Sequence, residues 1–275
     1  GCFPMMVGHR KLISLLAIVV LGGWFGSGAH GAAITPMDKA TGLYAAGNFL
    51  DAAALASRLK TAAGLTLAAR ATLAQGAYRS RPGEREALFK NAEAMARRAM
   101  RLDPKNGEAI RLLVIALGYI ARRTSPISAF FQGYATEARE LIGQAMRLDP
   151  LSPWGYSLLG AWHAEIVHGA GPALAATLYG ANQSAALANY ERAVVHAPDN
   201  PVIHFEYAKA LITLDPLKQG AKIRQLLTRA GGLRARDAVE TLIAARARRA
   251  LALLEAGEEE ALARLLYAGE RPPDG

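Results

Sequence analysis

Apolar residues recur at intervals of three and four along much of the chain, and each run stops shortly before a proline. Three of these runs have the apolar positions Ala92, Ala96 and Ala99; Ala138, Ile142 and Ala145; and Ala186, Tyr190 and Ala193. Residues at this spacing form one face of an α-helix, and an Asp-Pro or Ala-Pro pair ends the helix. The pattern predicts amphipathic helices that end before Pro104, Pro150 and Pro198.

Each of these stops is followed by the signal for another helix. Lys105-Asn106-Gly107, Ser152-Pro153 and Asn200-Pro201 each precede a further apolar stripe. Proline suits the first turn of a helix because its missing N–H is not needed there. We therefore expect a repeating unit of helix, turn, helix and a second turn.

A hexapeptide marks the repeat directly. Ala99–Pro104 reads AMRLDP and returns unchanged 46 residues later as Ala145–Pro150, and a looser copy follows after another 48 residues at Ala193–Pro198. Similarity at a long, nearly fixed spacing is typical of repeat arrays.

Further units are expected on both sides of these copies. The chain reads as a Gly-Asn-Phe turn between two helices at 43–53, a pair at 65–79 and 84–102, a helix at 217–230, and a terminal pair at 235–255 and 259–267 that would cap the array.

The unit resembles the tetratricopeptide repeat. The residues that carry the resemblance are Leu159-Gly160 in one helix, Ala186, Tyr190 and Ala193 in the next, and Pro198. The resemblance implies an all-α fold over residues 34–268: a tetratricopeptide-like α-solenoid, which is a right-handed superhelix of antiparallel helix pairs. That repeat has about 34 residues, so the units here are lengthened, with insertions at 123–133 and 168–182. The insertions are apolar, and they would pack on the helices or bind a partner.

A narrower resemblance covers roughly residues 90–215. Gly160–Glu165, Leu178–Ala181 and Ala186–Ala193 resemble the repeat domain of the regulator of microtubule dynamics family and its bacterial relatives. This resemblance implies an architecture with lengthened units and does not by itself imply an activity.

The first 33 residues have the order of a secretory signal peptide. His9-Arg10-Lys11 is basic, Leu12–Phe25 carries no charge, and small residues follow up to Ala33. A 14-residue helix reaches about 21 Å, short of the roughly 30 Å hydrocarbon core. We therefore expect cleavage after Gly31 or Ala33 and a periplasmic protein, with the inner membrane and an uncleaved anchor as the alternative. Gly1–Pro4 is expected to precede the true start at Met5 or Met6.

Composition narrows the classes of function. Hydrophobic residues make up 52% of the chain, which argues against disorder. Cys2 is the single cysteine and lies in the leader, so no disulfide or thiolate site is expected in the exported part. The formal charge is +9, and an exported chain has little access to nucleic acid. The arginines are expected to cover solvated helix faces or to meet an anionic membrane surface.

Catalytic chemistry finds little support in the sequence. His163, Glu165 and His168 are the nearest approach to a metal site, but histidines five apart do not share a helix face. We expect His163 to be a packing residue. With no phosphate loop or serine elbow, we expect no enzyme activity, no metal site and no cofactor.

The concave face of the predicted solenoid is the candidate binding surface. Aligning the units places the partner-binding candidates on it: Glu108, Arg111, Trp154, Ser157, Phe205 and Lys209. Trp154 and Phe205 would either contact a partner or pack between units. The resulting expectation is a non-catalytic exported repeat protein that binds a protein or peptide in the cell envelope. The alternative is a peripheral scaffold that binds anionic lipid through its arginine faces.

A polar tail is expected at 269–275.

Overall fold

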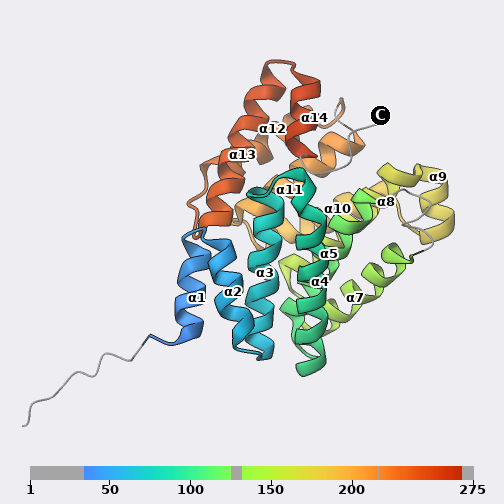
Figure 1. Ribbon diagram of the computed structural model, residues 1–275. Coiled ribbons are helices and arrows are strands. Elements are labelled where there is room, and N and C mark those ends of the chain that lie inside the picture. Colours follow the sequence, from blue (N-terminus) through green and yellow to red (C-terminus); the bar gives the residue numbers. More distant parts are fainter. Residues whose placement is uncertain (1–33, 125–131, 216, 268–275) are drawn as a thin grey trace, which may run out of the picture. The chain divides into compact units, whose positions relative to one another are not determined.

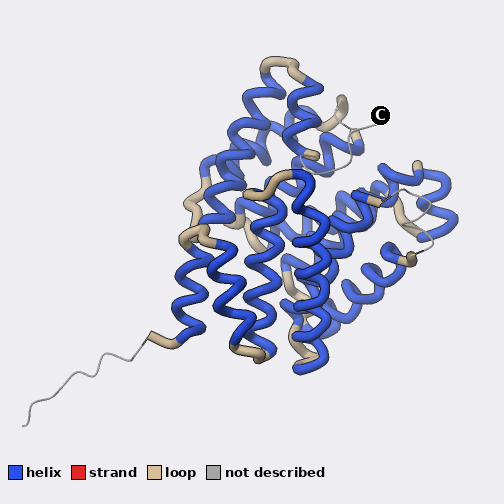
Figure 2. Tube along the Cα trace, in the orientation of Figure 1, coloured by secondary structure: helices blue, strands red, loops and turns tan. Residues whose placement is uncertain are grey.

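The computed structural model describes residues 34–124, 132–215 and 217–267 (Figure 1). The predicted leader at 1–33, most of the first insertion at 123–133 and the predicted tail at 269–275 lie outside the described residues. Within the described part, secondary structure is helical and contains no strand (Figure 2). The expected all-α class is therefore confirmed.

The helices follow one another in pairs, each packed against the next. The pairs are α1 (Pro36–Ala45) with α2 (Phe49–Arg58), α3 (Ala62–Tyr78) with α4 (Arg85–Leu102), α5 (Gly107–Arg123) with α7 (Tyr134–Leu148), α8 (Pro153–Ala170) with α10 (Gln183–His196), α11 (Pro201–Leu214) with α12 (Gly220–Gly232), and α13 (Ala238–Glu255) with α14 (Glu259–Leu266). A short 3-10 helix, Pro82–Glu84, precedes α4. The second insertion forms one helical turn, α9 (Pro172–Leu174), and a π-helix, η2 (Ala175–Tyr179).

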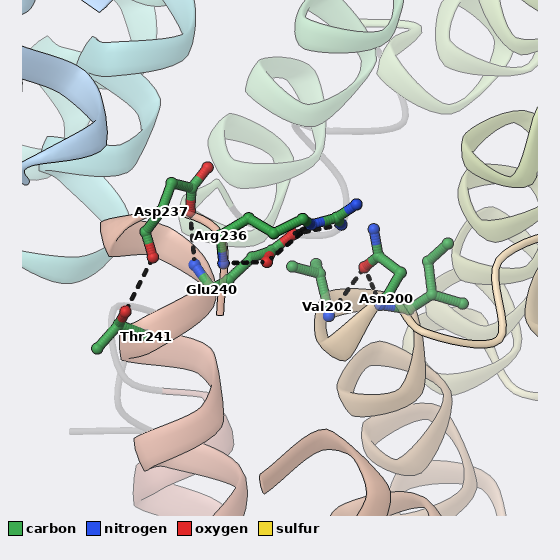
Figure 3. Close-up of polar contacts among 7 residues, drawn as sticks. Asn200, Val202, Arg236, Asp237, Glu240 and Thr241 are labelled. Carbon is green, nitrogen blue, oxygen red and sulfur yellow. Dashed lines mark hydrogen bonds and ion pairs between the residues drawn. The ribbon is translucent and has the colours of Figure 1, made fainter. Parts of the chain in front are cut away.

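Side-chain caps fix the predicted helix starts at Asn106 and Asn200, whereas Ser152, at the start of α8, makes no side-chain cap hydrogen bond. Asn106 accepts the backbone N–H of Ala109, and Asn200 accepts those of Val202 and Ile203 at 3.0 and 3.2 Å. Figure 3 shows the Asn200 cap. Such a cap satisfies N–H groups that have no partner within the helix, and it stabilises the helix by about 1 kcal/mol.

The predicted buried stripes are confirmed. Ala92, Ala96 and Ala99 have no exposed surface, and neither do Ala186 and Ala193. At the centre of the fourth pair, Gly160 lies against Tyr190: a Cβ on Gly160 would come within 2.8 Å of the tyrosine ring. Gly76 and Phe89 repeat this contact in the second pair, at 2.6 Å. The glycines let the two helices of a pair approach closely.

The first helices of successive pairs also contact one another. α1 contacts α3, α3 contacts α5, α5 contacts α8, α8 contacts α11, and α11 contacts α13. In addition α13 contacts α1, because Ala238, Val239 and Leu242 pack against the apolar cluster of the first two pairs. The terminal pair therefore contacts the first pair, which the sequence did not lead us to expect. No helix in the described residues has the length and apolarity needed to cross a bilayer.

Candidate functional site

A small pocket lies between the first helices of several pairs. Its walls come from α3, α5, α11, α13 and the end of α14: Ala77, Tyr78, Tyr119, Arg122, Phe205, Glu206, Lys209, Arg246, Leu266 and Tyr267. The space open to water-sized molecules is about 30 Å³, enough for one or a few waters. A space of this size fits the tip of a side chain rather than a nucleotide or a large cofactor.

Three cations of the pocket each lie over a tyrosine ring. Arg122 is 4.8 Å from the ring centre of Tyr119, and Lys209 is 5.5 Å from that of Tyr267. Arg246 is 5.3 Å from the ring centre of Tyr78. Each such pair contributes about 0.5–2 kcal/mol, depending on how far it is removed from water. The rings therefore hold three long cationic side chains in place around one small space.

Helical spacing brings these groups to one side. Tyr119 and Arg122 are three apart on α5, and Phe205 and Lys209 are four apart on α11. Residues at these intervals lie on the same helix face. Behind Tyr119, the ring of Phe89 on α4 stacks at 4.4 Å between centres and fixes the orientation of the tyrosine.

Glu165 on α8 joins the pocket to the fourth pair. Arg122 Nη1 donates to its carboxylate at 2.9 Å. Burial raises the pKa of Glu165, but the charges of Arg122, Lys209 and His168 outweigh that effect and hold the pKa below its usual value. The carboxylate is therefore ionised at neutral pH and neutralises part of the positive charge.

Tyr78 remains protonated at neutral pH. Burial raises the pKa of Tyr78 well above its usual value, with Tyr119 and Glu206 adding to the effect and Arg246 opposing it. The hydroxyl of Tyr267 hydrogen-bonds with that of Thr213, and its ring stacks on His168 at 6.1 Å. Thr213 already donates to the carbonyl of Lys209, so Tyr267 is the donor in this pair and its proton is used within the fold.

Arg85 lies close enough to Arg123 and Arg246 for their charges to act on it. Burial lowers the pKa of Arg85, and the nearby charges of Arg123 and Arg246 lower it further. Arg85 Nε donates to the carbonyl of Ser80 at 3.2 Å, and Arg123 Nη2 donates to that of Pro82 at 3.1 Å. These arginines hold the turn between α3 and α4.

Two of the predicted site residues line this pocket. Phe205 is 2% exposed, so its ring packs between units, whereas Lys209 is half-buried. Glu108 and Arg111 lie elsewhere on α5. Glu108 pairs with Arg70, and burial lowers the pKa of Arg111.

The other two candidates do not line the pocket either. Trp154 is half-buried near the start of α8, and Ser157 is buried. The structure therefore brings Phe205 and Lys209 together without Trp154.

Sequence reasoning missed Tyr78, Tyr119, Arg122 and Arg246. Arg122 and Arg246 are among the arginines that we expected on solvated helix faces or at an anionic membrane surface. The available signal was local: Tyr119 and Arg122 share a face on a helix that is otherwise apolar there. The partners Tyr78 and Arg246 come from α3 and α13, and no local pattern connects them.

His163 has a structural contact of its own. Its ring is 8% exposed, and Nδ1 accepts the backbone N–H of Asn182 at 3.2 Å. Burial, with a smaller contribution from Arg139, lowers the pKa of His163. This neutral ring joins α8 to the start of α10, and the described residues contain no cluster of metal-ligating side chains.

The comparison with known families agrees with this architecture. The family described as regulator of microtubule dynamics protein 1-3 matches residues 38–255. The chain belongs to this family. The match extends well beyond the region of roughly 90–215 on which the resemblance rested, and it includes every helix from α2 to α13. No curated protein shows significant similarity to the chain.

Proposed function

We propose that this family member is a non-catalytic repeat protein of the cell envelope that binds a protein or peptide partner through the pocket between its first helices. The single observation that carries the proposal is the convergence of Arg122, Lys209 and Arg246 on one small space, each over a tyrosine ring. A space of this size takes one side chain of a larger partner, and its cations favour an acceptor group on that side chain.

A tetratricopeptide-type solenoid is the finer architecture that we propose. Its support is the recurring contact of a small residue in a first helix with an aromatic ring in the second, at Gly76–Phe89 and Gly160–Tyr190. In such an array the first helices face inward, which agrees with the origin of the pocket residues.

Export to the periplasm is the proposed setting. It rests on the basic, apolar and small-residue segments at 9–33. N-terminal sequencing of the protein from a native host should find a start between Ala32 and Ile34. A chain that retains Met5 or Met6 and sediments with the inner membrane would contradict this part of the proposal.

The binding proposal is tested by capture from an envelope extract on the immobilised full chain. The double variant Lys209→Ala and Arg246→Ala should retain a captured partner at least about tenfold less well, because central anchor residues often contribute 2 kcal/mol or more each. The matched control is Lys39→Ala with Arg98→Ala, which removes the same charge from exposed positions on α1 and α4. Equal capture by both double variants would overturn the pocket as the binding site.

A further inference from the structure

The two identical hexapeptides adopt the same turn. Asp103 has φ −143° and ψ 95°, and Asp149 has φ −142° and ψ 88°. The N–H of Asp103 donates to the carbonyl of Ala99 at 2.9 Å, and that of Asp149 donates to the carbonyl of Ala145 at 3.0 Å. The prolines then end the helices. The alanine, aspartate and proline of the hexapeptide thus have structural roles.

The arginine and leucine between them have no such role. Leu102 and Leu148 are 54% and 42% exposed, and Leu151, just after the second copy, is 66% exposed. The preceding Arg101 and Arg147 are also exposed. A single exposed leucine is ordinary, but the same Arg-Leu pair exposed at two equivalent positions calls for a cause outside the helix packing.

The two turns lie side by side. Gln144 Nε2 donates to the carbonyl of Pro104 at 3.4 Å, which joins the end of α7 to the first turn. Leu148 Cδ1 lies 4.0 Å from the position that a Cβ would take on Gly107. The leucines therefore belong to one local surface, which we call the leucine edge: Leu102, Leu148 and Leu151 with Arg101, Lys105 and Arg147.

The bases of the leucine edge have no acidic partner in the part of the chain that the structure describes. Arg101, Lys105 and Arg147 form no ion pair with any of the described residues. The nearest acid along the first turn, Asp103, accepts the backbone N–H of Lys105 at 3.1 Å instead. The leucine edge combines exposed leucine side chains with long cationic side chains that an external anion can reach.

We propose that the leucine edge docks on an anionic lipid bilayer. The leucines enter the interfacial layer, and the bases contact headgroup phosphates. This combination of apolar burial and basic charge is what interfacial binding requires. Long basic side chains can reach the headgroups while their stems accompany the leucines. The proposal is independent of the pocket, because the edge lies at the turns after α4 and α7 and shares no residue with the pocket lining.

The test places a polarity-sensitive fluorophore on the full chain, in a Cys2→Ser background, at Leu148→Cys or at the control Leu50→Cys. Leu50 on α2 is 58% exposed, which matches the edge leucines. With vesicles of equimolar phosphatidylcholine and phosphatidylglycerol, the label at 148 should shift to the blue and the label at 50 should not. Attachment through another segment would leave the label at 148 in water, because the label reports only its own surroundings.

Charge dependence completes the test. Arg101→Glu with Arg147→Glu should weaken the response at 148 at least about tenfold, as should vesicles of phosphatidylcholine alone. A label at 148 that stays exposed to water on the anionic vesicles overturns the proposal. So does a blue shift that appears without vesicles and grows with protein concentration, which would make the edge a contact between two copies of the chain.

Discussion

At the scale of single residues, glycines and alanines decide how closely the helices of this protein approach. Gly160 packs against the ring of Tyr190. A Cβ added to Gly160 would also lie 3.1 Å from the carbonyl oxygen of Ala186. Gly118 is also in the interior of a helix, α5, but a Cβ there would have nothing within 4 Å. The two positions have the same local conformation and differ only in their neighbours.

Replacing these glycines by alanine should change stability in opposite directions. Alanine favours the helix over glycine by up to about 1 kcal/mol, so Gly118→Ala should raise the free energy of unfolding. In Gly160→Ala the added methyl meets the tyrosine ring and a backbone carbonyl, and overpacking costs about 1–3 kcal/mol. Urea denaturation followed by circular dichroism should therefore show a lower midpoint for Gly160→Ala. Equal shifts in both variants would mean that the helix contact is not close.

At the scale of elements, the second insertion packs partly on the helices beside it. Ala175 and Ala181 have no exposed surface, and the ring of Tyr179 lies 6.5 Å from that of Trp162. Leu174 and Leu178 point away, with 56% and 54% of their surface exposed. At the end of the insertion, Asn182 caps α10 and donates its own N–H to His163. The insertion is therefore anchored by a neutral histidine.

This anchor predicts a loss of stability in mild acid. Burial lowers the pKa of folded His163 below the 6.5 expected of the unfolded chain, and it does the same for His204. The unfolded state therefore binds more protons as the pH falls through 6.5. The contribution of the two neutral histidines to the free energy of unfolding is therefore complete above about pH 6.5 and is lost as the pH falls below it. Denaturation curves at pH 7.5 and pH 5 should show a lower free energy of unfolding at pH 5.

A substitution separates the two histidines. In His163→Gln the side-chain carbonyl can still accept the N–H of Asn182, but the side chain does not titrate. The difference in stability between the two pH values should become smaller than in the parent chain, and the part due to His204 should remain. An unchanged pH dependence would show that His163 is not the group responsible.

At the scale of the whole array, from α1 to α14, the first and last pairs are coupled by contact. Gly47, in the turn after α1, has φ +86°, and a Cβ there would lie 3.1 Å from that of Ala238 at the start of α13. Asp237 caps α13 by accepting the N–H of Glu240 at 2.8 Å, and Arg236 pairs with the Glu240 carboxylate (Figure 3). A well-defined helix start thus lies against the first pair.

Opening this contact should loosen both ends of the chain. Gly47→Ala adds a methyl against α13 and also strains a left-handed residue, which costs about 1–2 kcal/mol. Gly180→Ala is the matched control, because Gly180 is also left-handed, with φ +66°, and a Cβ there would have nothing within 4 Å. Hydrogen exchange should accelerate in both α1 and the start of α13 for Gly47→Ala. If the control produces the same acceleration in α13, the ends are not coupled through this contact.

The sequence by itself determined the helices and their pairing. The start of α11 at Asn200-Pro201 and the buried face of Ala186, Tyr190 and Ala193 were both predicted from short intervals. Capping and helix periodicity depend on residues within a few positions of one another, so the sequence displays them directly. The family was indicated for the same reason, because its features are repeated locally.

Only the tertiary structure decided which distant side chains meet. Arg246 reaches Tyr78 from a helix more than 150 residues away, and α13 contacts α1 although the two helices lie at opposite ends of the described chain. No local pattern encodes such contacts, so sequence reasoning placed Trp154 beside Phe205 and Lys209 and omitted Tyr78, Tyr119, Arg122 and Arg246. The pocket is set by how the pairs are stacked, whereas each pair is set by its own sequence.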